Sequence, residues 1–431
     1  MKKMTVHPVQ GLKGTLVVPG DKSISHRAVM LGSLAYGKTT VRHFLDSADC
    51  LSTAAIFRAL GVKIRQKGDR MEIWGKGLNS LKPSPKVLDA GNSGTSARIL
   101  LGLLSGQPFT TRLTGDKYLR RRPMRRVVEP LTRMGARFSG PDQSNLLPLR
   151  IEPRPLKGIH YELPVASAQV KSALMMAGLF AHGKTVITEP APTRDHTERM
   201  FSAFSIPFKK KGKVITVPGP TAPFKGRDLM VPGDISSAAF FIVAGLIVPG
   251  AKLQLKGVGV NPTRTGLLDA LGRMGAKITI KNIPVGRGEE PVADLTVSTS
   301  SLQGIRVEGE MVPRMVDEFP IFAVAATQAH GTTVVRDAQE LRVKESDRIL
   351  MMEVTLRRMG ADILATPDGW VIKGPTPLKG AVCSSGGDHR IAMSLAVAGL
   401  IAQGATTIND TENIDTSFPG FEKMLRKACI P

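Results

Sequence analysis

An internal repeat with six copies limits the folds that this chain can adopt. Each copy begins with an apolar run of helical character, which ends in glycine and is followed by a short β-like run. The six helical runs are Ser23–Gly37, Ser93–Gly106, Ser167–Gly183, Ser236–Gly250, Asp317–Gly331 and Asp388–Gly404. The copies recur roughly every 70 to 80 residues, and the apolar face of each copy needs neighbouring copies to cover it.

Most copies continue into a second helix that closes with a similar short phrase. The phrase is Met134-Gly135-Ala136, Met274-Gly275-Ala276 or Met359-Gly360-Ala361, and Leu60-Gly61-Val62 is a looser version of it. Each of these copies is therefore expected to hold two helices.

The long helices open with polar residues that suit an anion. The six openings are Gly20-Asp21-Lys22-Ser23, Gly91-Asn92-Ser93-Gly94-Thr95, Ala166-Ser167-Ala168-Gln169, Pro232-Gly233-Asp234-Ile235-Ser236-Ser237, Asp317-Glu318-Phe319-Pro320 and Gly386-Gly387-Asp388-His389-Arg390. Ordinary N-caps would explain the Ser, Asp and Asn residues. They would not explain the cations at the same ends, which oppose the helix dipole and include Lys22, Arg27, Lys171 and Arg390. An anion held between these cations and the helix N-termini would explain both.

Length and charge narrow the class of protein. A chain of 431 residues is too long for one compact core, so two domains are expected. The hydrophobic content of 42% is that of a folded soluble protein, and the formal net charge of +23 indicates anionic partners. Aromatic residues make up only 5% of the chain, and there is no basic tail. This favours small phosphorylated or carboxylated molecules over nucleic acid as partners.

The chain offers no sign of a metal, a cofactor or a membrane. The three cysteines, Cys50, Cys383 and Cys429, form no close pair, and the eight histidines show no metal-ligand spacing. No secretory segment follows Met1, and the longest apolar stretch, about Ala238 to Val248, is too short to span a bilayer. We therefore expect a cytoplasmic protein without cofactors or metals.

Two segments, Gly32–Thr39 and Gly178–Thr185, match the phosphate-binding string of P-loop proteins. A P-loop needs a strand before the string and a helix after it. Here helical runs precede the string and β-type runs follow it, and the same junctions at Gly331 and Gly404 lack the lysine. A nucleotide triphosphatase is therefore disfavoured, and these glycines are interpreted as helix C-caps.

Four groups of residues are candidates for chemistry. Lys22, Ser23 and Arg27 gather at one helix start, and Arg120–Arg126 contains five arginines, of which one beside Pro123 could hold a carboxylate or phosphate. Asp317 is either an N-cap or a general base. Lys344 and Arg348 lie four residues apart, which predicts one helical face, and a surface network is the alternative interpretation. This inventory suits proton transfer and electrostatic stabilisation on anionic substrates.

Over essentially its whole length, the chain resembles the 5-enolpyruvylshikimate-3-phosphate synthase family. Nine stretches, which follow one another in the same order, carry this resemblance. They are Pro19–Arg27, Gly91–Thr95, Arg122-Pro123, Ser167–Lys171, Arg194–Glu198, Asn261–Arg264, Asp317-Glu318, Lys344–Arg348 and Asp388–Arg390. The motifs Gly-Asp-Lys-Ser, Ser-Ala-Gln-x-Lys, Arg-x-His-x-Glu and Asn-x-Thr-Arg together resemble the class II branch of the family.

The resemblance implies an α/β (α+β) fold of two similar globular domains, each of three βαβαββ repeats, in an inside-out α/β barrel arrangement. One domain would hold residues 1–20 and 236–431, and the other would hold residues 21–235. The active site would lie in the cleft between the domains, which closes on the substrates.

The resemblance also implies the reaction and its residues. The enolpyruvyl (carboxyvinyl) group of phosphoenolpyruvate would pass to the 5-hydroxyl of shikimate 3-phosphate with release of phosphate, in the shikimate pathway to chorismate and the aromatic amino acids. Shikimate 3-phosphate would contact Lys22, Ser23, Arg27, Ser167, Ala168, Gln169, Arg194, Asp317 and Lys344. Phosphoenolpyruvate would contact Lys22, Gly94, Arg122, Gln169, Arg348 and Arg390. Asp317 would take the proton from the 5-hydroxyl, and Lys22 or Glu345 would protonate the methylene carbon.

Glyphosate, the known inhibitor of the family, occupies the phosphoenolpyruvate position. A methyl group in place of the second glycine of Gly-Asn-x-Gly is one route to tolerance, and this chain keeps Gly94 there.

Two alternatives belong to other classes of protein. The related UDP-N-acetylglucosamine enolpyruvyl transferases usually carry a cysteine in the loop that corresponds to Gly115–Arg122, and none is present. A basic RNA-binding repeat protein would explain the charge but not the carboxylates of Asp317 and Glu345. We expect a monomer that acts on small molecules and binds neither nucleic acid nor membranes.

Overall fold

The long helix of each copy forms where the polar opening meets the apolar run. The computed structural model describes residues 2–286 and 289–430. The helices are α1 (Lys22–Leu34), α3 (Gly94–Ser105), α6 (Ala168–Gly178), α8 (Ile235–Ile247), α11 (Phe319–Thr327) and α13 (His389–Gly399). Asp21, Ser93, Ser167, Asp234 and Asp388 are N-caps whose side chains accept a backbone hydrogen bond from the first turn. The expected helices and most of their caps are therefore confirmed.

The start of α11 differs from the prediction. Its N-cap residue is Glu318, whose side chain makes no capping hydrogen bond. Asp317 lies one residue earlier, so its interpretation as an N-cap is wrong.

The described part of the chain forms six small sheets, each with one parallel pair of strands and otherwise antiparallel pairs. In the sheet β10 (His160–Glu162), β11 (Gly183–Thr188), β13 (Val214–Gly219) and β12 (Lys209–Lys211), the strands on either side of the long helix, β10 and β11, are parallel, and the other pairs are antiparallel. Two further sheets are β14 (Asp228–Met230), β3 (Tyr36–Arg42), β5 (Arg70–Lys76), β4 (Lys63–Lys67), and β6 (Leu88–Asp89), β7 (Thr111–Thr114), β9 (Leu149–Glu152), β8 (Arg137–Ser139).

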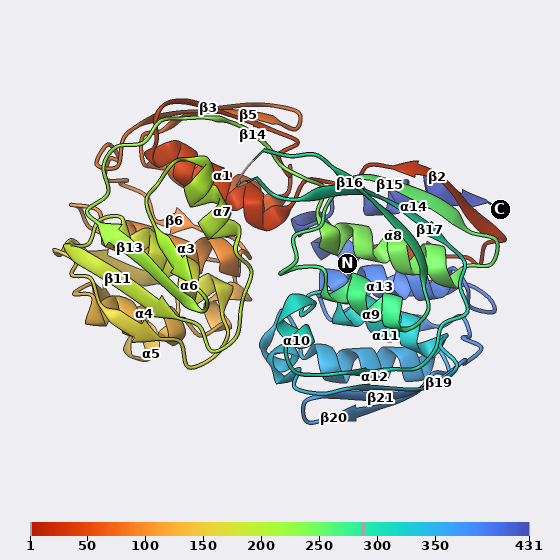
Figure 1. Ribbon diagram of the computed structural model, residues 1–431. Coiled ribbons are helices and arrows are strands. Elements are labelled where there is room, and N and C mark those ends of the chain that lie inside the picture. The colour runs from red at the N-terminus through yellow and green to blue at the C-terminus, as the bar shows by residue number, and fades with distance from the viewer. Residues whose placement is uncertain (1, 287–288, 431) are drawn as a thin grey trace. The chain divides into compact units, whose positions relative to one another are not determined.

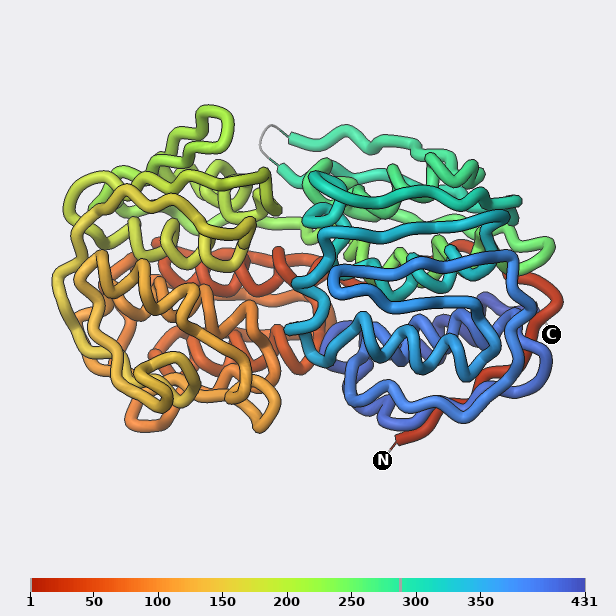
Figure 2. The backbone as a smooth tube through the Cα atoms, turned by 90° about the horizontal axis from the view of Figure 1, so that it is seen from below, coloured from red at the N-terminus to blue at the C-terminus, as the bar shows by residue number. Residues whose placement is uncertain are grey.

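The remaining three sheets include strands from both ends of the described chain. They are β16 (Lys277–Ile283), β17 (Val292–Ser298), β15 (Lys252–Gly259), β2 (Gly11–Leu16), β24 (Cys429–Ile430); β18 (Arg306–Val307), β19 (Gly331–Val335), β21 (Gly369–Gly374), β20 (Asp362–Thr366); and β1 (Lys3–Val6), β23 (Thr406–Asn409), β22 (Val382–Ser384). The N-terminal strands β1 and β2 thus complete sheets whose other strands come much later in the sequence, as the red and blue tubes of Figure 2 show.

A second helix follows the strand after each long helix. These helices are α2 (Ala48–Ala59), α4 (Arg125–Arg133), α7 (His196–Ala203), α9 (Gly266–Arg273), α12 (Arg348–Arg358) and α14 (Phe421–Ala428). Shorter segments are η1 (Leu119–Arg121), α5 (Pro141–Ser144), α10 (Met311–Arg314), η2 (Gln339–Val343) and η3 (Thr411–Thr416).

The closing phrase of the second helices is a Schellman C-cap. After α4, Gly135 has a φ of 103°, and the N–H of Ala136 donates to the carbonyl of Leu131 at 3.0 Å. The phrases after α2, α9 and α12 repeat this bond. It also follows α7, where Ser205, with a φ of 57°, takes the place of the glycine. The sequence pattern missed that copy because the residue is not glycine.

The second glycines of the two P-loop-like strings are placed differently from the prediction. Gly37 and Gly183 lie in β3 and β11, with φ angles of 92° and 89°, and the preceding helices end at Leu34 and Gly178. Their interpretation as helix C-caps is therefore wrong. The order of helix before strand is confirmed, and it is incompatible with a P-loop.

The chain divides into two compact units. Unit 1 comprises residues 2–19, 232–285 and 291–430 of the described chain, and unit 2 comprises residues 20–231 with 286, 289 and 290. The long helices α8, α11 and α13 pack together in unit 1 (Figure 1), and the other three, α1, α3 and α6, are in the core of unit 2.

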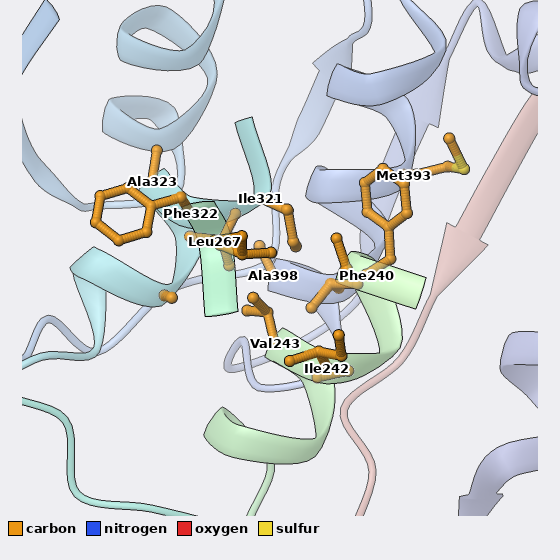
Figure 3. Packing of buried hydrophobic residues seen from close by; sticks show 14 of the residues in the cluster. Phe240, Ile242, Val243, Leu267, Ile321, Phe322, Ala323, Met393 and Ala398 are labelled. Carbon is orange, nitrogen blue, oxygen red and sulfur yellow. The ribbon is translucent and has the colours of Figure 1, made fainter. Parts of the chain in front are cut away.

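The long helices are apolar on all sides because they form the centre of each unit. Figure 3 shows side chains of α8, α9, α11 and α13 gathered in the core of unit 1, among them Phe240, Leu267, Phe322 and Met393. The helices of unit 2 approach so closely that a Cβ on Gly102 of α3 would lie 2.0 Å from the carbonyl oxygen of Ala173 on α6. This packing fixes the helix N-termini, where the candidate residues lie.

Candidate functional site

The start of α1 places a lysine near the surface and an arginine beneath it. The Lys22 ammonium pairs with the carboxylate of Asp49, at 3.0 Å, and Ser23 is half-buried next to it. Arg27 is buried, and its guanidinium donates to Thr197 Oγ1 and Ser172 Oγ at 2.7 Å and to the carbonyl of Ser23 at 2.9 Å. Burial lowers the pKa of Arg27 to about 10. Arg27 therefore anchors the start of α1 to neighbouring helices.

The start of α3 lies under two guanidinium groups. Arg122 donates through Nη2 to Asn92 Oδ1 at 2.8 Å. A Cβ on Gly94 would lie 2.8 Å from Arg98 Nη1 and 3.4 Å from Arg122 Nη1. The absence of a side chain at Gly94 thus makes room for both cations. Of the five arginines predicted around Pro123, only Arg122 is half-buried, and the other four are exposed, which fits the prediction of one held guanidinium.

Arg98 connects this helix start to the next one. Its Nη1 donates to Gln169 Oε1 at 3.0 Å, and its Nη2 donates to the carbonyl of Pro123 at 3.1 Å. Gln169 in turn donates to Thr95 Oγ1 at 3.2 Å. The predicted residues Gly94, Arg122 and Gln169 are therefore brought together around Arg98. We refer to Lys22, Ser23, Gly94, Arg98, Arg122 and Gln169 as the unit 2 cluster.

Lys171 does not belong to an anion site, contrary to the prediction. It is fully buried, and its ammonium pairs with Glu189 at 3.0 Å and with Glu198 at 2.8 Å. Two carboxylates close to the ammonium therefore explain the cation near the start of α6. Ser167 caps this helix and Ala168 begins it. The predicted residue Arg194 follows Thr193, whose N–H donates to Glu189 at 3.1 Å.

In unit 1, Asp317 lies beside guanidinium groups from two other helix starts. Its Oδ1 is 3.5 Å from Arg348 Nη1, and its Oδ2 is 3.9 Å from Arg390 Nη2. Arg348 begins α12, and Arg390 lies in the first turn of α13. Three predicted residues from distant parts of the sequence are thus brought together. We refer to Asp317, Glu345, Arg348, Asp388 and Arg390 as the unit 1 cluster.

Arg348 is the most strongly held cation of this cluster. It is 1% exposed, and it contacts Asp388 through Nε at 2.8 Å and Glu345 through Nη2 at 2.7 Å. Burial alone would lower the pKa of Arg348, but Asp388, Glu345 and Asp317 raise it. Burial also opposes ionisation of Asp388, yet Arg348 holds the pKa of that carboxyl below its usual value. Arg348 and Asp388 therefore hold each other in their charged forms.

Lys344 and Arg348 do not share a helical face. Lys344 follows η2, and α12 begins only at Arg348 with Asp347 as its N-cap. The prediction of one helical face is wrong, because Lys344 is one of four non-helical residues between η2 and α12. Lys344 and Glu345 lie half-buried in this connection.

The part of the chain that the structure describes contains no group of three or more His, Cys, Asp or Glu side chains that could hold a metal ion. Among the same residues, no helix is long and apolar enough to cross a membrane.

The sequence analysis missed Arg98, and it missed the contacts within a second group of residues. Arg98 could have been found, since it lies four residues after Gly94 on α3 and so faces the same side. A second group contains Arg264, Glu318, Asp234 and Ser236, buried next to the unit 1 cluster. The motif around Arg264 was only one of the stretches that resemble the family. Its spacing did not indicate which residues Arg264 contacts.

Over nearly its whole length the chain is similar to known proteins of one family. The family model for EPSP synthase (3-phosphoshikimate 1-carboxyvinyltransferase) matches residues 6–425. A protein of Geobacter sulfurreducens named 3-phosphoshikimate 1-carboxyvinyltransferase is 55% identical over 430 residues, which is 100% of each chain. A protein of the same name from Desulforudis audaxviator is 56% identical over 423 residues, 98% of each chain. The solved structure of EPSP synthase from Acinetobacter baumannii has a TM-score of 0.89 and 45% identity, and the match covers 100% of this chain and 98% of that one.

Proposed function

Because the chain belongs to the EPSP synthase family, we propose that the unit 1 and unit 2 clusters together transfer the enolpyruvyl group of phosphoenolpyruvate to the 5-hydroxyl of shikimate 3-phosphate. The observation that supports this reaction is the match of the family model to residues 6–425. Both substrates are small polyanions, which agrees with the net charge of +23 and with the cations gathered at helix N-termini.

In unit 2, Arg122 and Gln169 would hold phosphoenolpyruvate over Gly94, and Lys22 would lie close to both substrates. The planar guanidinium of Arg122 suits a carboxylate or a phosphate, and its bond to Asn92 fixes its direction. Shikimate 3-phosphate would contact a wider set, which comprises Lys22, Ser23, Arg27, Ser167, Ala168, Gln169, Arg194, Asp317 and Lys344. Within this set, Arg27 would attract the substrate through its charge from below the surface, because its guanidinium already donates hydrogen bonds to Ser172 and Thr197.

In unit 1, Arg348 and Arg390 would complete the phosphoenolpyruvate site. Arg390 is held less tightly than Arg348, because its guanidinium has one ion pair, at 3.9 Å, among the contacts of the described residues. It is therefore the cation with more capacity to bind an incoming anion. The proposal requires residues of both units to act on the same substrate pair.

The proton transfers would use Asp317 and either Lys22 or Glu345. Asp317 would remove the proton of the 5-hydroxyl as that oxygen attacks C2 of phosphoenolpyruvate, and Lys22 or Glu345 would protonate the methylene carbon. The reverse proton transfer would then expel phosphate. The observation that carries the role of Asp317 is its position between two guanidinium groups while Glu318 occupies the helix N-cap.

The experiment is a coupled assay of phosphate release from phosphoenolpyruvate. The wild-type chain should release phosphate with shikimate 3-phosphate and not with UDP-N-acetylglucosamine as the acceptor. Asp317→Asn should lower kcat by about 100-fold or more, because it removes a general base while leaving the helix N-cap intact. The matched control is Asp362→Asn, an exposed carboxylate on β20, which should keep wild-type turnover. Normal turnover in a folded Asp317→Asn variant would refute the role of Asp317.

The proposal also includes a monomeric protein in the cytoplasm that binds neither nucleic acid nor membranes. The three cysteines are free, and Cys50 and Cys383 are buried, which suits a reducing compartment. Sedimentation at assay concentrations would test the monomer.

A further inference from the structure

Glu318, the residue that follows Asp317, belongs to a buried group of charged and polar residues in unit 1. Arg264 and Glu318 are 3% and 1% exposed, and Arg264 Nη2 is 3.6 Å from Glu318 Oε1. Arg264 Nη2 also donates to Ser236 Oγ at 2.7 Å and lies 3.4 Å from Asp234 Oδ1. The hydroxyl of Ser236 donates to Glu318 Oε1. Because one charged partner left alone at such depth is strongly unfavourable, the group holds its members in one arrangement.

Glu318 uses its side chain unusually for an N-cap residue. Its carboxylate makes no bond to the first turn of α11 and instead reaches Ser236 at the start of α8. The backbone N–H of Glu318 donates to the carbonyl of Met315, and its carbonyl accepts from Phe322. Glu318 is therefore held at the start of α11 by its backbone and tied to the start of α8 by its side chain.

Arg264 is itself held in a fixed turn. The side chain of Asn261 accepts from the N–H of Thr263 at 2.9 Å, and the N–H of Arg264 donates to the carbonyl of Asn261 at 2.7 Å. Asn261 is also buried. The turn presents the guanidinium of Arg264 to Glu318 from a segment outside the unit 1 cluster.

We propose that Arg264 and Glu318 are positioning residues that set the distance of Asp317 from Arg348 and Arg390. Neither residue is among those that the family resemblance assigns to substrate. The 3.5 and 3.9 Å separations leave the Asp317 carboxylate near two cations without a short hydrogen bond to either. Without its anchored neighbour, the segment of Asp317 can shift towards the guanidinium groups. A carboxylate bound tightly by arginine is a weaker base, so proton removal slows. This inference depends on the proposed function, because it assigns the base role to Asp317.

Three variants test the proposal: Glu318→Gln, Arg264→Met and the double variant Arg264→Met/Glu318→Met. Each single variant should lower kcat by about 10- to 100-fold, since small displacements of a catalytic group have effects of this size. The KM values for both substrates should stay within about threefold, because the loss falls on the transition state. Arg336→Met, which removes a half-buried ion pair with Asp368 elsewhere in unit 1, is the control for charge loss and should keep wild-type kcat.

The double variant separates positioning from stability. Replacing both members of a buried ion pair by apolar residues often restores stability that a single replacement loses. The thermal midpoint should therefore recover in the double variant while kcat stays low. Recovery of kcat together with the midpoint would overturn the proposal. A further control, Leu271→Ala in the core of α9, lowers the midpoint without touching a charge. If it lowers kcat as much as the single variants do, the proposal is also wrong.

Glu318→Gln decides the matter if the other variants fail to fold, because it keeps the shape of the side chain and removes only the charge that pairs with Arg264. A kcat within twofold of wild type would overturn the proposal, and a tenfold fall with unchanged KM would support it. Failure of the proposed function gives a different result, since the wild type would then release no phosphate. Failure of the base role alone would leave Asp317→Asn with normal turnover, whatever the Glu318 variants show.

Discussion

A methyl group at Gly94 should disturb the phosphoenolpyruvate site through Arg98. The Cβ of Gly94→Ala would lie 2.8 Å from Arg98 Nη1, whereas ordinary contact begins near 3.4 Å. The guanidinium must therefore move by roughly 0.6 Å, which is the overpacking expected from an added methyl group. Arg98 is held by Gln169 Oε1 at 3.0 Å and by the carbonyl of Pro123 at 3.1 Å. A shift of this size stretches at least one of these bonds beyond hydrogen-bonding distance.

The magnitude follows from the bond that is lost. A hydrogen bond to a charged group contributes about 1.5–3 kcal/mol, and each 1.4 kcal/mol is a factor of ten in an equilibrium constant. Ligands that depend on Gln169 and Arg122 should therefore bind about 10- to 100-fold more weakly. Glyphosate is the longer molecule, so its inhibition constant should rise more than the KM for phosphoenolpyruvate.

The assay measures phosphate release over a range of phosphoenolpyruvate and glyphosate concentrations for the wild type and Gly94→Ala. Gly272→Ala on α9 is the matched control, because no atom lies within 4 Å of its added Cβ. In an Arg98→Met background, Gly94→Ala should add little, since the guanidinium that the methyl displaces is gone. An unchanged ratio of the two constants in Gly94→Ala would refute the reasoning, and full additivity with Arg98→Met would refute the route through Arg98.

Three further predictions concern stability. Burial, together with Lys22 and Arg27, lowers the pKa of His26 well below 6.5. The unfolded chain therefore takes up a proton near pH 6.5 that the folded chain does not. Stability should fall below that pH, and urea titrations should show the loss relative to His26→Gln growing by up to about 1.4 kcal/mol per pH unit. Ser205→Gly should raise the free energy of unfolding by about 0.5–1 kcal/mol, because it relieves a left-handed backbone; no change in urea would contradict this. Lys171→Met should destabilise the chain by about 3–5 kcal/mol in the same assay, since it removes the ammonium between two buried carboxylates, of which Glu198 keeps Lys210 at 3.5 Å; a loss under 1 kcal/mol would contradict the ion-pair role.

The positions of the helices could be predicted from the sequence because their signals are local. A polar residue such as Ser93 or Asp388 followed by an apolar run marks a helix start wherever the chain continues. The same local pattern showed that helix precedes strand at both P-loop-like strings. For Arg122, the position beside Pro123 was enough to separate it from its exposed neighbours.

The partners of buried charges could not be predicted in this way. Lys171 is neutralised by Glu189 and Glu198, which come from later segments, so the sequence showed only a cation near a helix start. The bond of Arg98 to Gln169 likewise joins two helices, and the bond of Arg264 to Ser236 joins a turn to a helix. Such contacts are set by how the helices pack, and a local pattern carries no information about them.

The placement of β1 and β2 affects the order in which the chain can fold during synthesis. Thr15 of β2 bonds to Gln254, and Thr5 of β1 bonds to Thr407, across 239 and 402 residues of sequence. Nearly all of unit 2 lies in one continuous stretch, residues 20–231, which leaves the ribosome while both N-terminal strands still lack their partners. Unit 2 can therefore fold first, as N-terminal domains generally do. Unit 1 must wait for β23 and then close very long loops, so its strands stay exposed longest and are the segments most in need of protection from aggregation.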